Sequence, residues 1–316
     1  MKDYFPSASR LVYGCMGLGG QWDQQPVNTD HVYQARTLID TALDLGITVF
    51  DHADIYTLGK AEKAFGQALS EAPDLRDRMI IQSKCAIRFE DELGPKRYDF
   101  SSQWITQSVE GSLKRLGTEQ LDILLLHRPD PLMELDEVAN TIAALQQAGK
   151  IKHLGVSNMH GHQIAYLQSA LNTPVIANQL EMSLAFRDWL EDGITTNSEY
   201  NRSMGYAPGT LEYCMMNKVT LQAWGSLAQG RFTGAGTHSV EDERTAHTVK
   251  QLAADYGVTP EAIVIAWLMR HPAGIQPVLG TTSPKRLAAC AQAMSVSLHR
   301  EHWYLLLETA RGNEVP

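Results

Sequence analysis

Residues 47-ITVFDHADIY-56 begin as an alternating run of apolar side chains and end in two carboxylates, a histidine and a tyrosine. Runs rich in branched apolar residues, seven to eight positions or fewer in length, are typical of buried β-strands. Seven further runs of this kind follow along the chain, namely 11-LVYGCM, 78-RMIIQSK, 121-LDILLLH, 151-IKHLGVSN, 175-VIANQLE, 219-VTLQAW and 275-IQPVLGTT. The sequence therefore predicts eight strands.

Helical patterns lie between these runs, and many of them end in a glycine that the next strand follows. Examples are 31-HVYQARTLIDTALDLG, 102-SQWITQSVEGSLKRLG, 134-ELDEVANTIAALQQAGK and 284-PKRLAACAQAM. Alternating strands and helices indicate parallel strands with helical crossovers, and eight repeats favour a closed (β/α)8 TIM barrel over an open doubly wound sheet, which is the runner-up. No linker or change in composition divides residues 1–316, so we expect a single barrel domain.

Several segments fall outside the repeat. Residues 184–208 and 228–246 are polar, contain glycine and are long enough to be functional loops on the C-terminal face of the barrel. The tail 299-HREHWYLLLETARG-312 predicts an extra C-terminal helix. The apolar run 262-AIVIAWLM-269 follows the helix-start signal Thr259-Pro260-Glu261 and is too short for a membrane span, so it predicts a buried helix.

Composition narrows the class of protein. The 316 residues include 27 Lys and Arg against 36 Asp and Glu, a net charge of −9 with neutral histidine, and no run of five basic residues, which argues against a nucleic-acid partner. The four cysteines lack CxxC spacing, which fits packing roles in a reducing compartment. Because neither a signal peptide nor a membrane-length apolar segment is present, we expect a cytoplasmic protein with no membrane partner.

Four polar side chains follow three consecutive predicted strands: Asp51 and Tyr56 after the second, Lys84 at the end of the third and His127 at the end of the fourth. In a barrel of this class, the C-terminal ends of the strands form the active-site face. Taken separately, each has an ordinary explanation such as helix capping, solvation or packing. The sequence therefore predicts that these four side chains lie close together on one rim.

Together the four side chains form a unit for proton transfer. A Lys84 ammonium would lower the pKa of the Tyr56 phenol, and Asp51 would keep a desolvated Lys84 charged. His127 remains to donate a hydrogen bond to a carbonyl oxygen and orient it. Such a unit suits the protonation of an oxygen while a hydride arrives at carbon, so the sequence should also contain a nicotinamide site.

A phosphate site is expected at the last predicted strand. The glycine-rich stretch 14-GCMGLGG-20 lacks the order and context of a dinucleotide fingerprint, so we interpret it as a strand-end loop. In 280-GTTSPKR-286, Ser283 is a plausible N-cap and Pro284 occupies the first helical position. Helix N-termini bind phosphates through free amides and the helix dipole. An ordinary capped helix with basic surface residues is the alternative interpretation.

With these motifs, the chain resembles the aldo-keto reductases over nearly its whole length, from 11-LVYGCMGLG to 284-PKRL. The pattern Asp51-x4-Tyr56, then Lys84, then His127 is similar to the catalytic tetrad of that family in order and strand position. The resemblance implies a bacterial-type, NADP-dependent alcohol dehydrogenase or carbonyl reductase in which Tyr56 donates the proton. It also implies that the substrate contacts Trp22, Tyr56 and His127.

The resemblance assigns further residues to the cofactor. The motif 155-GVSN-158 and Gln179 would bind the nicotinamide carboxamide, and Trp224 would stack on its ring where tyrosine or phenylalanine is more frequent. Arg286 corresponds to the arginine that meets the adenine and the 2′-phosphate, which favours NADPH, while the absence of a Lys-Ser pair at 280–281 leaves NADH possible. The expected cofactor-binding residues are Gly14, Cys15, Met16, Asp51, Ser157, Asn158, Gln179, Trp224, Gly225, Leu227, Gln229, Gly280, Thr281, Thr282, Ser283, Arg286 and Cys290.

The substrate class stays broad at the level of sequence. Expected pocket walls are Trp22, the stretch 87–89 after Lys84, and Trp189 and Tyr200 of the long 184–208 segment. Aromatic and aliphatic walls favour a partly apolar, small-molecule carbonyl compound.

Two other classes of function share some of these sequence features. Some members of the superfamily are NADPH-binding, redox-sensing regulatory subunits with slow turnover, although this sequence indicates no protein partner. A metal-dependent barrel hydrolase or isomerase would need more ligands at the strand ends than His127 and Asp51, so no metal site is expected.

Overall fold

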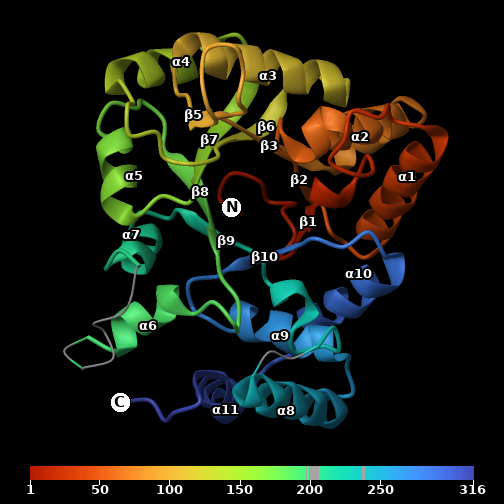
Figure 1. The fold of residues 1–316 in the computed structure, drawn as a ribbon, viewed down its shortest axis with the longest axis vertical. Helices are drawn as coiled ribbons and strands as arrows, with labels where there is room; N and C mark the ends of the chain where they lie inside the picture. Colours follow the sequence, from red (N-terminus) through yellow and green to blue (C-terminus); the bar gives the residue numbers. More distant parts are fainter. Residues whose placement is uncertain (197, 199–205, 237–238) are drawn as a thin grey trace. The chain divides into compact units, whose positions relative to one another are not determined.

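The computed structural model describes residues 1–196, 198, 206–236 and 239–316. Eight parallel strands form a closed barrel in the order β1-β10-β9-β8-β7-β6-β3-β2 (Figure 1). The strands are β1 (Val12–Gly14), β2 (Val49–Asp51), β3 (Ile80–Cys85), β6 (Leu121–Leu126), β7 (Ile151–Ser157), β8 (Val175–Glu181), β9 (Thr220–Trp224) and β10 (Gln276–Leu279). Seven of them lie within predicted runs and β3 extends one residue beyond its run, so the predicted (β/α)8 barrel is confirmed.

Helices connect the strands. They are α1 (Thr29–Asp44), α2 (Lys60–Ser70), α3 (Ser102–Leu116), α4 (Leu135–Gln147), α5 (Gly161–Gln168), α6 (Asp188–Ile194), α7 (Thr210–Met216), α8 (Val240–Tyr256), α9 (Pro260–Met269), α10 (Pro284–Ala291) and α11 (Arg300–Arg311). Short 3-10 turns are η1 (Cys15–Gly17), η2 (Tyr56–Gly59), η3 (Pro73–Arg78), η5 (Ala228–Gly230) and η6 (Gln292–Ser295). Local sequence sets many of the ends: the Ser101 hydroxyl accepts from the Trp104 amide at the start of α3, and Gly117 ends that helix in the left-handed conformation.

Contacts divide the chain into two compact units, and the expectation of a single domain stays a prediction. The first unit is Met1–Gln179 with Gly280–Thr282, and the second is Leu180–Leu279 with Ser283–Pro316. In the first unit, neighbouring helices pack in chain order, α1 on α2, α2 on α3 and α3 on α4. In the second, α8 packs on α9 and α11, and α10 packs on α9.

Burial follows from these arrangements. All six residues of β3 and all six of β6 are buried, as expected for parallel strands covered on both faces. In the second unit, residues 262–268 of α9 are all buried, which confirms the predicted buried helix. The indole of Trp267 in this helix stacks on Trp303 of α11 at 5.3 Å between ring centroids.

Three segments differ from the prediction. A small antiparallel hairpin of β4 (Ile87–Arg88) and β5 (Arg97–Tyr98) was not predicted. The segments expected as loops are partly helical, since α6 lies within 184–208 and α8 begins at Val240 within 228–246. The start of α8 has a local cause, because the Ser239 hydroxyl accepts from the Asp242 amide and acidic residues fill the first turn. The predicted C-terminal helix is confirmed as α11.

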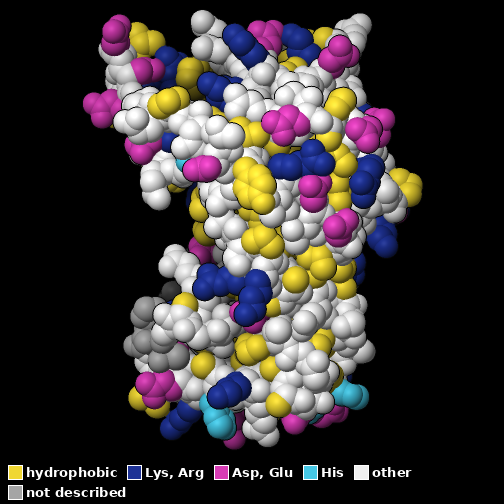
Figure 2. Space-filling view, turned by 90° about the vertical axis from the view of Figure 1, so that its right-hand side faces the viewer, with side chains coloured by type: hydrophobic (Ala, Val, Ile, Leu, Met, Phe, Trp, Pro, Cys, Tyr) yellow, Lys and Arg dark blue, Asp and Glu magenta, His cyan; other side chains and the backbone are white. Residues whose placement is uncertain are grey.

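Two surface properties concern possible partners. On the face drawn in Figure 2, Lys and Arg side chains are interspersed with Asp and Glu, and this face presents no extended basic surface. Within the described ranges, no single helix is long and apolar enough to cross a bilayer; α8 and α9 reach the required length only as a pair, and they meet at 93°.

Candidate active site

The centre of the site is the ammonium group of Lys84, at the C-terminal end of β3. Lys84 Nζ donates to both carboxylate oxygens of Asp51 at 2.7 Å, to the His52 carbonyl at 2.9 Å and to Tyr56 Oη at 2.9 Å. Only 1 % of Lys84 and 2 % of Asp51 is exposed. Because a buried charge is tolerated only when it is paired and hydrogen-bonded, these contacts explain how both ions can be buried.

Amide groups hold the Asp51 carboxylate in place. Asp51 Oδ1 also accepts from Gln82 Nε2 at 2.5 Å and from Gln179 Nε2 at 3.1 Å. Asp51 pairs with Gln82 in the β2–β3 register, and Gln179 lies in β8. The carboxylate is therefore fixed from two strands, while its second oxygen accepts from the ammonium.

The protonation states differ in one respect from those expected. Burial lowers the pKa of Lys84, but Asp51 and Tyr56 outweigh burial, and the pKa is raised overall, so the ammonium stays charged. Burial raises the pKa of Tyr56 more than the Lys84 charge lowers it, and Asp51 raises it further. The expectation of a lowered Tyr56 pKa is therefore wrong, although Lys84 acts in the predicted direction. Tyr56 is a neutral phenol at neutral pH and carries the proton that it can donate.

His127 follows β6 and lies beside Tyr56, with the two rings edge to face at 6.1 Å between centroids. Its backbone amide donates to the Cys85 carbonyl at 3.0 Å, which ties it to the end of β3. Burial and the positive charges of Lys84, Arg128 and Lys96 lower its pKa to about 2. The imidazole is therefore neutral at physiological pH and can donate one hydrogen bond without carrying a charge.

The turn that carries Tyr56 is held in an uncommon conformation. Thr57 (φ 47°) and Leu58 (φ 60°) both lie in the left-handed region, which is costly for residues with a Cβ and is often found at functional sites. The Thr57 hydroxyl donates to the Leu18 carbonyl at 2.9 Å and is buried. This contact with the loop after β1 helps to hold the turn, and with it the phenol.

A buried carboxylate behind the turn was missed at the level of sequence. Glu62 of α2 has no exposed surface and accepts from Ser83 Oγ at 2.6 Å and from Arg115 Nε at 2.7 Å. Ser83 is the neighbour of Lys84 in β3, and Arg115 lies in α3. Glu62 thus connects the strand that carries Lys84 with two helices. The sequence holds no signal for it, because an acidic residue in the first turn of a helix usually faces solvent.

Asp54 precedes the Tyr56 turn and provides a testable pH dependence. Burial and the nearby Glu62 carboxylate raise its pKa from 3.8 to about 7, against hydrogen bonding with Ser108 and attraction to Arg115. Because the folded-state pKa lies above the unfolded value, the contribution of Asp54 to the unfolding free energy is complete below about pH 4. This contribution falls as the pH rises towards 7. We expect Asp54→Asn to remove this loss, so that the difference in melting temperature between variant and wild type grows by about 2–4 °C from pH 5 to pH 8.

Thermal unfolding at pH 5, 6, 7 and 8 measures this difference. Asp44→Asn, at an exposed position near the end of α1, is the matched control and should show no such trend. A gap between Asp54→Asn and wild type that stays constant over this range would contradict the assignment.

Three of the expected nicotinamide residues join the same network. Ser157 Oγ donates to the Gln179 carbonyl at 2.9 Å, and Asn158 Nδ2 donates to Ser157 Oγ at 2.8 Å and to the His127 carbonyl at 3.1 Å. Asn158 has φ 58°, a conformation that asparagine tolerates better than most residues. The ends of β7 and β8 therefore bring these amide and hydroxyl groups next to the Asp51–Lys84 pair.

The loop after β1 packs against residues 280–282. Tyr13 Oη donates to the Thr281 carbonyl at 3.1 Å, and a Cβ on Gly17 would lie 2.8 Å from the Thr282 methyl group. Glycine is therefore required for this close approach. Within the loop, Gly14 and Cys15 are buried, while Met16 and Trp22 are exposed. The expected residues Gly280, Thr281 and Thr282 thus lie beside this loop.

The remaining expected cofactor residues belong to the second unit. Trp224 ends β9 half-buried, and Gly225, Leu227 and Gln229 follow it in a turn where Gly225 has φ 67° and Gln229 has φ 57°. Ser283 caps α10 by accepting from the Arg286 amide, and the Arg286 side chain is exposed.

Two expected contacts are not supported. Cys290 has no exposed surface, and burial raises its pKa to about 12, so it offers no surface to an adenine ring. Trp189 is only 1 % exposed and packs edge to face on Trp267 at 5.9 Å, which makes it a core residue rather than a pocket wall. The sequence alone does not indicate whether an apolar side chain in a loop-like segment becomes a core residue or a pocket wall.

The other residues expected to line the substrate pocket differ in their exposure to solvent. Phe89 and Trp22 are exposed, Ile87 is buried, and Tyr200 lies outside the described residues. In the described ranges, no group of three or more His, Cys, Asp or Glu side chains is arranged to hold a metal ion.

Comparison with known proteins gives a consistent result. Residues 10–309 match the family model described as the aldo/keto reductase family. The chain is 37 % identical over 314 residues to 6-dehydroglucose reductase of Agrobacterium fabrum, with 97 % of this chain and 96 % of that protein covered. It is 37 % identical over 315 residues to the oxidoreductase YdhF of Escherichia coli, with 98 % and 96 % covered. The crystal structure of the thermostable aldo-keto reductase Tm1743 in complex with the inhibitor epalrestat superposes with a TM-score of 0.75 at 25 % identity, covering 95 % of each chain.

Proposed function

The chain belongs to the aldo/keto reductase family and is an oxidoreductase, and on this premise we propose that it reduces an aldehyde or a ketone to the alcohol with NADPH. The observation that carries the proposal is the hydrogen bond of 2.9 Å between Lys84 Nζ and Tyr56 Oη, inside the buried pair that Lys84 forms with Asp51. A phenol held against a permanent positive charge can release its proton and then be stabilised as the phenolate.

Each residue of the tetrad has one task in this reaction. Tyr56 gives its proton to the carbonyl oxygen as the carbon is reduced, and the Lys84 ammonium compensates the phenolate that forms. Asp51 keeps that ammonium charged. His127, neutral and beside Tyr56, donates a hydrogen bond that orients the carbonyl oxygen. In alcohol oxidation the same groups would act in reverse, with the phenolate as base.

A bound nicotinamide cofactor would supply the hydride, and the chemistry of the side chains present fits such a group. Ser157, Asn158 and Gln179 offer hydroxyl and amide groups suited to a carboxamide, directly beside the tetrad. The N-terminus of α10, with Ser283 as cap and exposed Lys285 and Arg286 in its first turn, suits a phosphate. We assign the ring-stacking role to Trp224.

Arg286 should set the preference for NADPH over NADH. We expect Arg286→Ala to weaken NADPH binding by roughly tenfold or more, since a charged hydrogen bond to a phosphate contributes about 1.5–3 kcal/mol, and to change NADH binding much less. Titration of tryptophan fluorescence with each cofactor measures both affinities. Arg244→Ala, at an exposed position in α8, is the matched control. Equal losses for NADPH and NADH would count against a 2′-phosphate contact.

For the substrate, we propose a polar aldehyde. A relative that is 37 % identical over nearly the whole of both chains is named 6-dehydroglucose reductase, so polyhydroxylated aldehydes of this kind head the candidates. The test is NADPH consumption by the wild-type protein with 6-dehydroglucose, simple aldehydes, ketones, dicarbonyls and quinones. A kcat/KM for 6-dehydroglucose above that of the simple aldehydes, ketones and quinones supports the polar aldehyde, and the absence of multiple turnover with all of them would refute carbonyl reduction.

A further inference from the structure

A small hairpin leaves the barrel directly after the strand that carries Lys84. Ala86 turns the chain outward with φ 87°, and the Asp99 amide returns to the Ala86 carbonyl at 3.0 Å. The amide of His127 donates to the carbonyl of the preceding residue, Cys85, also at 3.0 Å. The base of the hairpin and His127 are therefore anchored to adjacent residues at the end of β3.

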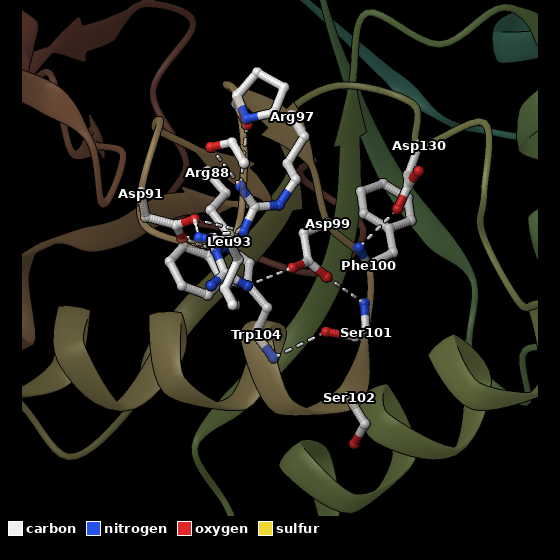
Figure 3. Close-up of polar contacts among 12 residues, drawn as sticks. Arg88, Asp91, Leu93, Arg97, Asp99, Phe100, Ser101, Ser102, Trp104 and Asp130 are labelled. Carbon is white, nitrogen blue, oxygen red and sulfur yellow. Dashed lines mark hydrogen bonds and ion pairs between the residues drawn. The ribbon is translucent and has the colours of Figure 1, made fainter.

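Side-chain ion pairs fix the shape of this hairpin (Figure 3). Arg88 donates to Asp91 at 2.7 Å and to Asp99 at 3.0 Å, and its guanidinium lies over the Trp104 ring at 4.3 Å. Arg97 donates to both carboxylate oxygens of Asp91 at 3.0 Å. The two guanidinium groups and the two carboxylates thus compensate one another. Arg88 is therefore ion-paired within the hairpin, and its role as a wall of the substrate pocket stays a prediction.

One further carboxylate joins the hairpin to the segment that follows β6. Asp130 Oδ2 accepts from the Phe100 amide, and Asp130 Oδ1 accepts from the Leu132 amide, both at 2.9 Å. Figure 3 shows Asp130 reaching the Phe100 amide at the exit of the hairpin. Residues 127–132 and the hairpin therefore form one structure held by hydrogen bonds.

Two cations in this structure are left without such partners. Within the described residues, no hydrogen bond or ion pair involves the side chain of Arg128 or of Lys96. Arg128 directly follows His127 and is half-buried, while Lys96 is exposed in the hairpin turn. The segment that carries Arg128 is tied by hydrogen bonds to the hairpin that carries Lys96. The positive charges of Arg128, Lys96 and Lys84 each lower the pKa of the His127 imidazole.

We propose that Arg128 and Lys96 form a recognition site, next to His127, for a negatively charged substituent of the carbonyl substrate. The inference rests on the proposed carbonyl reduction and departs from the neutral 6-dehydroglucose considered above: it assigns the preference to aldehydes or ketones that carry a carboxylate, phosphate or sulfonate group. A half-buried guanidinium has lost part of its hydration, and an anion would restore its hydrogen bonds, often in a bidentate manner.

The charge of the whole protein opposes the approach of anions, so an anionic substrate would depend on cations at the binding site itself. With a net charge of −9, the molecule repels anionic substrates at long range. Local cations beside the reacting carbonyl would reverse that repulsion where the substrate binds. Exposed Lys96 suits the attraction of an approaching anion, which salt screens strongly, whereas half-buried Arg128 suits direct contact in the complex.

A matched pair of aldehydes tests the inference. 4-Carboxybenzaldehyde and methyl 4-formylbenzoate present the same aldehyde, one with a charge and one without. We expect wild type to prefer the carboxylate in kcat/KM by roughly tenfold or more, mainly through KM, because a charged hydrogen bond discriminates by about this factor. Arg128→Gln should lower the carboxylate-to-ester ratio by roughly tenfold, and Lys96→Gln should lower it less and mainly at low salt.

The controls separate this inference from the proposed function. Arg78→Gln and Lys114→Gln, at exposed positions in η3 and α3, should leave the ratio unchanged. A wild-type ratio near one, or an unchanged ratio in Arg128→Gln, overturns the recognition site even when both aldehydes are reduced. Glyceraldehyde 3-phosphate compared with glyceraldehyde gives the phosphate arm of the same test.

A binding measurement keeps the inference testable without turnover. Calorimetric titration of the alcohol product 4-(hydroxymethyl)benzoate, in the presence of NADPH, with which it cannot react, should give a dissociation constant roughly tenfold weaker for Arg128→Gln than for wild type. Equal affinities would overturn the recognition site. Failure of wild type to reduce any aldehyde, with this difference in affinity intact, would refute only the proposed function.

Discussion

Tyr56→Phe is expected to lower kcat for aldehyde reduction by about 10²–10⁴-fold, the range that a positioned proton donor contributes. The substitution removes only the hydroxyl that lies 2.9 Å from Lys84 Nζ, so the ring and its packing beside His127 remain. NADPH affinity should change by less than about threefold, because the phenol contributes to proton transfer and not to holding the cofactor. Steady-state turnover and fluorescence titration measure the two quantities.

The control for this variant is Tyr33→Phe, which removes the same hydroxyl from an exposed tyrosine of α1. It should retain wild-type kcat. Turnover of the Tyr56→Phe protein at the wild-type rate would show that another group supplies the proton, and the mechanism proposed above would then be wrong.

Lys84→Met is expected to cost both stability and activity. The substitution leaves the Asp51 carboxylate buried at 2 % exposure without its counter-charge, and breaking a buried pair in this way costs about 3–5 kcal/mol of unfolding free energy. Urea unfolding measures the loss. Lys114→Met, at an exposed position of α3, should be close to neutral and serves as the control.

The double variant Asp51→Asn with Lys84→Met separates structure from chemistry. With both charges gone, most of the lost stability should return, since replacing a buried pair by neutral groups is often close to neutral. Activity should not return, because no charge remains to stabilise a Tyr56 phenolate. Recovery of activity together with stability would mean that Lys84 has only a structural role.

Local sequence predicts one part of the candidate active site and misses another. The order Asp51, Tyr56, Lys84, His127 could be read from strand ends because a parallel barrel places the C-terminal ends of its strands on one rim. The contacts of Lys84 with Asp51 and Tyr56 are consistent with that reading. Glu62 and Arg115 could not be found in the same way, because they lie on helices and meet only through packing of α2 on α3.

What the sequence determined by itself was the series of eight strands and most of the helices between them. Buried parallel strands are largely apolar on both faces, which leaves nearly continuous apolar runs, and helix ends such as Thr259-Pro260 and Gly117 are set by neighbouring residues. These signals are local, so they survive without knowledge of the tertiary structure.

Only the tertiary structure decided which polar groups are buried and which have partners. Burial raised the pKa of Tyr56 against the effect of Lys84, placed Trp189 in the core, and left Arg128 half-buried beside His127 while Arg88 was taken by the hairpin. Desolvation and pairing depend on atoms that lie far apart along the chain. A pattern of residue types therefore cannot assign them.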